Sequence, residues 1–131
     1  MTLSGESLTL CNETYVDEHQ SIKRVVVLAS VFQIDVAKRN VGTFMGDGTF
    51  DSVPSLFTQM FTIHALHGDT SFPIAFALME GKTTRGYEIV FRVLKDNGVI
   101  IHTFMCDFER ASRNAIKNIF NDVYVKGCWF H

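Results

Sequence analysis

The sequence predicts an α/β domain built on a mixed sheet, in which three antiparallel strands precede a helix, a strand, a helix and a strand. Three observations lead to this prediction. Apolar and polar residues alternate with the period of a strand through much of residues 41–80. The apolar period then lengthens to that of a helix over residues 83–98. A nearly continuous apolar run follows at residues 99–106, as in a buried strand.

The composition is that of a globular intracellular protein. The chain has 131 residues, enough for one domain with a single core, and its 47% apolar and 20% charged residues exclude a disordered chain. A net charge of −2 provides no overall basic field for nucleic acid, so any contact with DNA would depend on local patches. No apolar run is long enough to span a bilayer, and no secretory signal precedes the domain. Three cysteines, an odd and sparse set, indicate a reducing compartment.

Residues 1–40 are expected to form an N-terminal tail with a lead-in strand and helix. The first twenty residues or so are polar and weakly patterned, so we interpret them as a tail or as the remnant of a preceding segment. The β-branched run at residues 22–30 predicts a strand, and residues 31–40 predict a short helix. The inner side of that helix would hold Val31, Ile34 and Ala37.

Residues 41–131 are expected to form the main part of the domain, beginning with a meander. A strand at residues 41–50 is followed by Pro54, which lacks a backbone donor and interrupts the ladder. Strands at residues 56–66 and 72–80 are joined by the turn "HGDTS", so the three strands are predicted to pair in antiparallel fashion. One face of the second strand would hold Phe57, Phe61, Ile63 and Ala65.

The second half predicts two helices that alternate with strands. Residues 83–98 form the first helix, capped by Thr83 or Thr84 and ended at Gly98. Its inner stripe would comprise Tyr87, Val90, Phe91 and Leu94. The apolar run at residues 99–106 predicts a strand buried on both faces.

A second helix is predicted at residues 109–120, and a further strand begins at residue 123. The inner stripe of this helix would comprise Ala111, Ala115, Ile116 and Ile119. A strand joined through a helix to another strand favours a right-handed crossover and parallel pairing. The whole pattern therefore indicates a mixed sheet covered by helices.

Two aspartates stand where functional side chains gather in such sheets. Asp47 lies between two glycines in "MGDGTF", and Asp107 directly follows the apolar run. Residues at the carboxyl ends of strands line the functional crevice of open α/β sheets, so neighbouring strands would bring the two carboxylates together. Two divalent metal ions would remove their repulsion and support phosphoryl transfer, and oxygen ligands favour Mg²⁺ or Mn²⁺. The alternatives are a turn for Asp47 and a helix N-cap for Asp107.

Three stretches of the sequence together resemble the Mutator-like (MULE) transposase domain. They are "GDGTFDSVPSLFTQMFTIHAL", "FPIAFALMEGKTTRGYEIVFRVLKDNG" and "CDFERASRNAIKNIFNDVYVKGCWFH", which occur in unbroken order between about Val41 and His131. The resemblance implies an RNase H-like fold, a DDE triad that cuts and joins DNA with divalent metal, and a nuclear location. Asp47 resembles the first acidic ligand of that triad and Asp107 the second. On this interpretation the glycines beside Asp47 leave room around the metal.

The sequence departs from the family at the third acid. That ligand is a glutamate well downstream of a C-x-x-H motif, whereas the present sequence ends with the motif at His131. Two acidic residues follow Asp107, and neither matches: Glu109 suits a helix start and Asp122 a turn. We therefore expect an incomplete core that needs a downstream segment and DNA-binding modules. Other copies of the chain are a further candidate partner, in a homo-oligomer. The alternative is an inactive domesticated or decayed transposase relic that binds DNA or protein.

The C-x-x-H motif itself consists of Cys128 and His131, at positions that match the family motif. A thiolate and an imidazole at this spacing can share a zinc ion, but a closed structural zinc site needs four ligands. We therefore expect a structural or orienting role for this pair rather than zinc binding.

Other polar residues give weaker indications. Arg110, Arg113 and Lys117 share one helix face, where they would contact DNA phosphates or simply form a solvated surface. The segment "GKTTRG" lacks the spacing of a phosphate-binding P-loop. His64 and His67 have no triad partner, so we expect them to be satisfied or exposed histidines.

Overall fold

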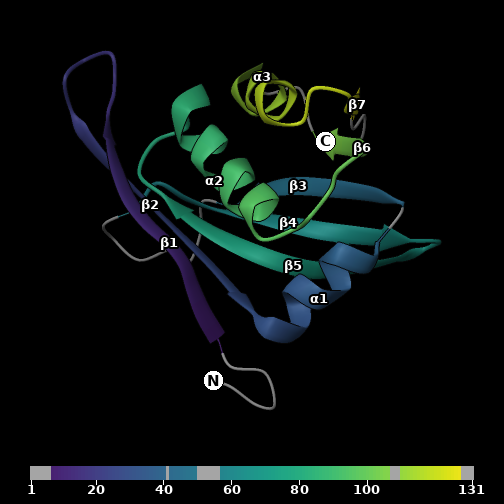
Figure 1. Cartoon of the computed structure of the whole chain (residues 1–131). Helices are drawn as coiled ribbons and strands as arrows, with labels where there is room; N and C mark the ends of the chain where they lie inside the picture. The colour runs from purple at the N-terminus through teal and green to yellow at the C-terminus, as the bar shows by residue number, and fades with distance from the viewer. Residues whose placement is uncertain (1–6, 41, 50–56, 107–109, 128–131) are drawn as a thin grey trace.

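A computed structural model describes residues 7–40, 42–49, 57–106 and 110–127, which form a seven-stranded sheet and three helices (Figure 1). The strands are β1 (Ser7–Val16), β2 (Ile22–Ser30), β3 (Thr43–Thr49), β4 (Gln59–His67), β5 (Thr70–Met79), β6 (Thr103–Cys106) and β7 (Tyr124–Gly127). The helices are α1 (Val31–Arg39), α2 (Thr84–Asp96) and α3 (Arg110–Ile119). The order of strands across the sheet is β1-β2-β5-β4-β3-β6-β7. Within these described parts, no helix has the length and apolar character needed to cross a membrane.

The mixed character of the sheet confirms the predicted α/β class. β3, β4 and β5 form the expected antiparallel meander, and Gly68 supplies a positive φ of 61° in the turn between β4 and β5. β6 lies parallel to β3, and β7 lies parallel to β6. The helical connection through α3 therefore joins two parallel neighbours, as the crossover rule predicts.

The helix α2 begins, ends and packs as its sequence predicts. Thr83 is its N-cap, and Gly98 follows its end with a φ of 91°. All four residues of the predicted inner stripe are fully buried. The aromatic rings of α2 make edge-to-face contacts with phenylalanine rings of the sheet. These contacts form a chain that runs from Tyr87 through Phe61 and Phe91 to Phe104. This chain of rings joins α2 to β4 and β6.

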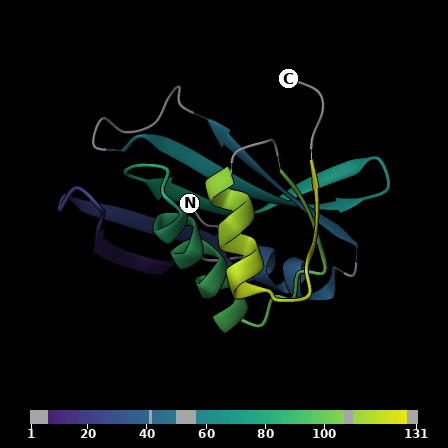
Figure 2. The same ribbon diagram turned by 90° about the horizontal axis from the view of Figure 1, so that it is seen from above.

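The helix α3 packs beside α2 over the same face of the sheet (Figures 1 and 2). Its buried residues are Ser112, Ala115, Ile116 and Ile119, so Ala111 of the predicted stripe is only partly buried. The Nζ of Lys95 in α2 donates a hydrogen bond of 2.9 Å to the carbonyl oxygen of Ile119. That contact links the end of α2 to the unpaired carbonyls at the end of α3.

The helix α1 packs against β5 and β2, and the Lys38 side chain lies against Gly98 at the end of α2. Ile34 and Ala37 are buried as predicted, but Val31 is 56% exposed. Val31 is the first helical residue, directly after the N-cap Ser30, so it lies outside the stripe that contacts the sheet.

The prediction that the apolar run at residues 99–106 is buried on both faces is wrong. Ile100 precedes the strand and is 62% exposed, and within β6 the side chains alternate between buried and partly buried. The same alternation occurs along β2 and β5, because the described helices cover one face of the sheet. The opposite face, called here the open face, carries partly buried apolar side chains, among them Val26, Leu28, Met60, Phe76 and Leu78.

The assignment of the first twenty residues to a tail is also wrong for residues 7–16, which form the edge strand β1. β1 pairs with β2 along its whole length, and Cys11 and Tyr15 are buried against the core. Burial raises the pKa of the Cys11 thiol to about 11. Asn12 and Thr14 lie on the exposed side of this strand, as an antiparallel edge allows, and Glu13 is also exposed although it alternates onto the side of Cys11 and Tyr15.

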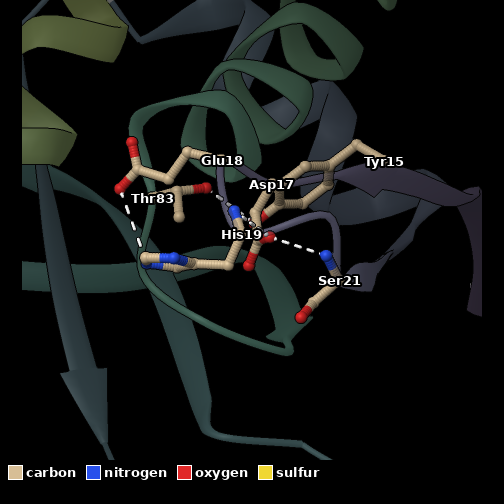
Figure 3. A network of polar contacts seen from close by, with 6 residues as sticks. All are labelled: Tyr15, Asp17, Glu18, His19, Ser21 and Thr83. Atoms are coloured by element: carbon tan, nitrogen blue, oxygen red, sulfur yellow. Dashed lines mark hydrogen bonds and ion pairs between the residues drawn. The ribbon is translucent and has the colours of Figure 1, made fainter.

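A compact turn joins β1 to β2 (Figure 3). One carboxylate oxygen of Asp17 accepts hydrogen bonds of 2.9 Å from the backbone N–H groups of His19 and Ser21. The bond from Ser21 is the main reason why the pKa of Asp17 is lowered. The Tyr15 hydroxyl lies 2.6 Å from Oγ1 of Thr83, the N-cap of α2. The hairpin is thereby tied to the helix that covers the sheet.

The Tyr15→Phe variant is expected to lower the free energy of unfolding by about 1 kcal/mol, the usual net value of one hydrogen bond. Thr83 keeps its capping contact with the backbone N–H of Gly86 in this variant, so α2 itself remains capped. Urea unfolding followed by circular dichroism measures the difference. Tyr124→Phe is the control, because Tyr124 is 65% exposed. Equal unfolding midpoints for the two variants would contradict the stabilising role of this contact.

Candidate functional site

Asp47 lies in β3 on the open face of the sheet, where its side chain is exposed. Its partner across the ladder is Thr62 of β4. Successive side chains of a strand point to opposite faces, so Gly46 and Gly48 face the helices. The apolar strand thus keeps its core residues on one side and presents a single carboxylate on the other.

The family resemblance implies that the glycines beside Asp47 leave room around a metal. The structure gives them a different role. A Cβ at Gly46 would lie 2.5 Å from Cζ of Phe61 and 2.7 Å from Cζ of Phe104. A Cβ at Gly48 would lie 2.5 Å from Oε1 of Gln59. Both glycines therefore make room for core side chains beneath the sheet. In "GDG", the two glycines therefore pack against the core on the helix-covered face, and the aspartate between them is exposed on the other face.

The strand that carries Asp47 has β6 as its parallel neighbour. The described pairing runs from Thr43 with Thr103 to Met45 with Met105. Asp47 lies two residues beyond Met45, and β6 ends at Cys106. The structure therefore meets the condition, set from the sequence, that these two strands be neighbours. Asp107, the second predicted ligand, lies outside the described residues.

His64 lies on the same open face as Asp47 but was not predicted as a site residue. It is directly opposite Met45 in the ladder between β3 and β4. The side chain is half-buried, and its Nδ1 is buried without a hydrogen-bond partner among the described residues. Burial lowers the pKa of His64, and the Asp47 carboxylate opposes that shift. The expectation of a satisfied or exposed histidine is therefore wrong for His64, whereas His67 is exposed as expected.

The basic residues of α3 do not form one uniform exposed row. Arg110 and Lys117 are exposed, but Arg113 is partly buried, and its Nε is buried without a hydrogen-bond partner in the described part of the chain. Cys128 and His131 of the C-x-x-H motif lie outside the described residues, as does Glu109. Asp122 is exposed in the turn before β7, as the sequence indicated.

The described ranges contain no group of three or more histidine, cysteine or acidic side chains placed to hold a metal ion. A surface hollow of about 460 Å³ lies elsewhere, between the β1–β2 hairpin and the start of α2. Its lining combines acidic residues of the hairpin with Lys82 and Arg85, and Figure 3 shows several of the hairpin residues. Opposite charges in one shallow hollow give no preference for an anionic or a cationic ligand. Of the two predicted metal ligands, Asp47 is the one that lies within the described residues.

Comparison with known proteins identifies the family. The family model described as the MULE transposase domain matches residues 43–131, more than half of the chain. The chain belongs to this family. No curated protein and no solved structure matches it. A transposase-related role, and interaction with DNA in general, follow from membership of the MULE transposase domain family.

The match to the MULE domain starts at Thr43, the first residue of β3. It includes the meander, α2, β6, α3 and β7, together with Asp47 and His64. The preceding β1, β2 and α1 lie before the match, yet β2 pairs with β5 and extends the same sheet. The segment before the MULE domain match is thus part of the folded structure around it.

Proposed function

We propose that this chain is the core of a DDE-type DNA transposase, in which Asp47 and Asp107 bind divalent metal for phosphodiester hydrolysis and strand transfer. The observation that carries the proposal is the parallel pairing of β3 with β6. That pairing puts the strand of Asp47 beside the strand that Asp107 follows in the sequence. Parallel neighbours present their carboxyl ends at the same edge of a sheet, which is where such sites form.

The arrangement of elements supports an RNase H-like fold as part of this proposal. A meander of three antiparallel strands is followed by α2, β6, α3 and β7, and β6 pairs with the first strand of the meander. The strand order is therefore the one that brings the first and fourth strands of this unit together. It places the strand of Asp47 beside β6, the strand that Asp107 follows in the sequence, although sixty residues separate the two aspartates in the chain.

The residues present fit a hard divalent cation. Asp47 is an exposed carboxylate with no hydrogen bond or ion pair among the described contacts, so its oxygens are available to a ligand. Oxygen ligands and retained water favour Mg²⁺ or Mn²⁺. When bound, two such ions supply activation of a water or hydroxyl and stabilisation of the leaving oxygen. The chain itself orients Asp47, because Gly46 and Gly48 fit closely against the core beneath it.

DNA contact by α3 and a nuclear location belong to the same proposal. Arg110 and Lys117 are exposed on α3 and can approach phosphates, whereas Arg113 is held partly inside. Cys128 and His131 are proposed to stabilise or orient the chain after β7 rather than to bind zinc, since a closed zinc site needs four ligands.

The second candidate function is a transposase relic that binds DNA or protein without catalysis. This alternative comes from the sequence, because neither acidic residue that follows Asp107, Glu109 or Asp122, matches the third acid of the family. The two candidates differ in one measurable property, because a relic has no need to bind Mn²⁺ through Asp47.

Mn²⁺ titration of the whole chain tests the proposed function. Electron paramagnetic resonance reports the unbound aqueous ion, so its signal gives the bound fraction. Asp47→Asn is expected to weaken Mn²⁺ binding by at least about tenfold, equivalent to about 1.4 kcal/mol, because it removes a charged oxygen ligand. Asp122→Asn is the matched control, since Asp122 is exposed at the start of β7, at the opposite end of the parallel strands.

The expected result is loss of binding in Asp47→Asn and unchanged binding in Asp122→Asn. If both variants bind Mn²⁺ as the unsubstituted chain does, the metal site is placed wrongly and the relic function is favoured. Circular dichroism of each variant establishes that the substitution leaves the fold intact.

A further inference from the structure

His64 occupies a specific place relative to Asp47 on the open face. The ladder between β3 and β4 pairs Met45 with His64 and Asp47 with Thr62. Asp47 and His64 are therefore diagonal neighbours on one face of an antiparallel pair. Diagonal neighbours in an antiparallel pair are about 7–8 Å apart, with their Cβ atoms somewhat closer, a separation that a long or aromatic side chain can span. The sheet thus holds a carboxylate and an imidazole within reach of one common ligand.

The imidazole has an unused binding atom. Nδ1 of His64 is excluded from solvent and has no hydrogen-bond partner among the described residues. Buried ring nitrogens are normally paired, so an unpaired one calls for a ligand. A neutral imidazole has one nitrogen with a free lone pair, which is the form that binds metal ions. His67, three residues further along the same strand, is exposed and shares none of these features.

The residues that pair with His64 and with its partner Met45 are uncharged. Met45 lies directly across the ladder, and Met105 of β6 pairs with Met45 on its other side. Pro73 of β5 is the partner of His64 on the remaining side. None of these neighbours carries a charge, and Asp47 is the charged group recorded as acting on the imidazole. A ring nitrogen and a carboxylate oxygen, both able to bind a metal ion, therefore lie on one face in diagonal positions.

We propose that His64 supplies a ring nitrogen to the divalent cation that Asp47 binds. This inference rests on the proposed function, because it concerns the same cation. A site with one imidazole nitrogen and carboxylate oxygens prefers a first-row transition ion over Mg²⁺, which demands oxygen ligands. His64 thereby biases the site toward Mn²⁺ and away from Mg²⁺.

Pulsed electron paramagnetic resonance of the Mn²⁺-loaded chain tests this coordination directly. Electron spin-echo envelope modulation detects a nitrogen nucleus bound to Mn²⁺. We expect nitrogen modulation in the unsubstituted chain and in the control His67→Gln, and its loss in His64→Gln. Mn²⁺ affinity of His64→Gln is expected to fall by about tenfold, at the lower end of the range for groups that support a metal site. The affinity for Mg²⁺, measured by competition, is expected to change less.

The outcomes separate this inference from the proposed function. If the unsubstituted chain binds no Mn²⁺ through Asp47, the proposed function fails and the role of His64 fails with it. If Asp47-dependent binding occurs without nitrogen modulation, the proposed function stands and the His64 inference alone is overturned. Loss of the fold in His64→Gln does not remove the test, because modulation in the unsubstituted chain still reports the ligand and His64→Asn offers a smaller replacement.

Discussion

The Phe91→Ala variant is expected to lose about 3–5 kcal/mol of unfolding free energy, the usual effect of removing a fully buried phenylalanine side chain. Phe91 of α2 has no exposed surface, and its ring packs edge to face on two others. The ring centroids lie 6.2 Å from Phe61 and 5.3 Å from Phe104. Removal of this ring therefore leaves a cavity at the junction of α2, β4 and β6. Urea unfolding followed by circular dichroism measures the loss.

Phe32→Ala is the matched control for Phe91→Ala. Phe32 also makes an edge-to-face contact, with Phe72 at 6.0 Å, but its side chain is 59% exposed. We expect a much smaller loss, because most of the ring is already in contact with water. Similar losses for the two variants would show that ring contact alone, rather than burial in the centre of the core, determines the effect.

The Gly46→Val variant is expected to destabilise the fold by about 3 kcal/mol, the upper end of the usual range for an overfilled core. The new side chain would meet the rings of Phe61 and Phe104 at distances well below van der Waals contact. The β3 backbone would have to move away from α2, and Asp47 would move with it. Thermal or urea unfolding measures the change, and Thr49→Val in the exposed part of β3 is the control.

A double-mutant cycle with Phe104→Leu identifies the cause of the Gly46→Val effect. Leucine removes the Cζ atom of Phe104 but leaves that of Phe61, so the destabilisation by valine should be smaller, though not absent, in the Phe104→Leu background. If the two substitutions are simply additive, steric crowding at Phe104 is not the reason for glycine at this position.

The sequence predicts the elements whose apolar pattern is strong and local. α2 has four apolar residues at helical spacing, so its stripe, its cap at Thr83 and its end at Gly98 all agree with the structure. The meander is predicted because short turns between alternating strands leave few other ways to pair them. The sequence alone does not decide whether β3 and β6 are neighbours; their parallel pairing, which is the basis of the candidate site, comes from the structure.

Features that depend on distant partners are not visible in the sequence. β1 has polar residues on its exposed side, and its buried Cys11 and Tyr15 become part of the core only through pairing with β2 and contact with α2. The prediction that β6 is buried on both faces is wrong because such burial requires helices on both faces of the sheet, and these helices come from distant parts of the chain. A local apolar run carries no information about such coverage.

In the candidate site, too, local features can be predicted from the sequence and features that depend on distant residues cannot. Asp47 is predictable, because a carboxylate flanked by glycines in an apolar strand is unusual. The reason for those glycines is not, since Phe61 and Phe104 reach Gly46 from other strands. His64 escapes prediction because only the register between β3 and β4 shows that it shares a face with Asp47.

The order of strands in the sheet also has a consequence for the way the chain acquires its structure. The ladders on either side of the central β3–β4–β5 meander join distant segments: Val27 pairs with Ala77, and Thr43 pairs with Thr103. Long loops must close, with loss of chain entropy, before either ladder contributes stability. The β4–β5 hairpin closes over a short turn, so we expect it to form early. Contacts of long sequence separation are characteristic of slow folding, so we expect the β3–β6 pairing beside Asp47 to form later than this hairpin.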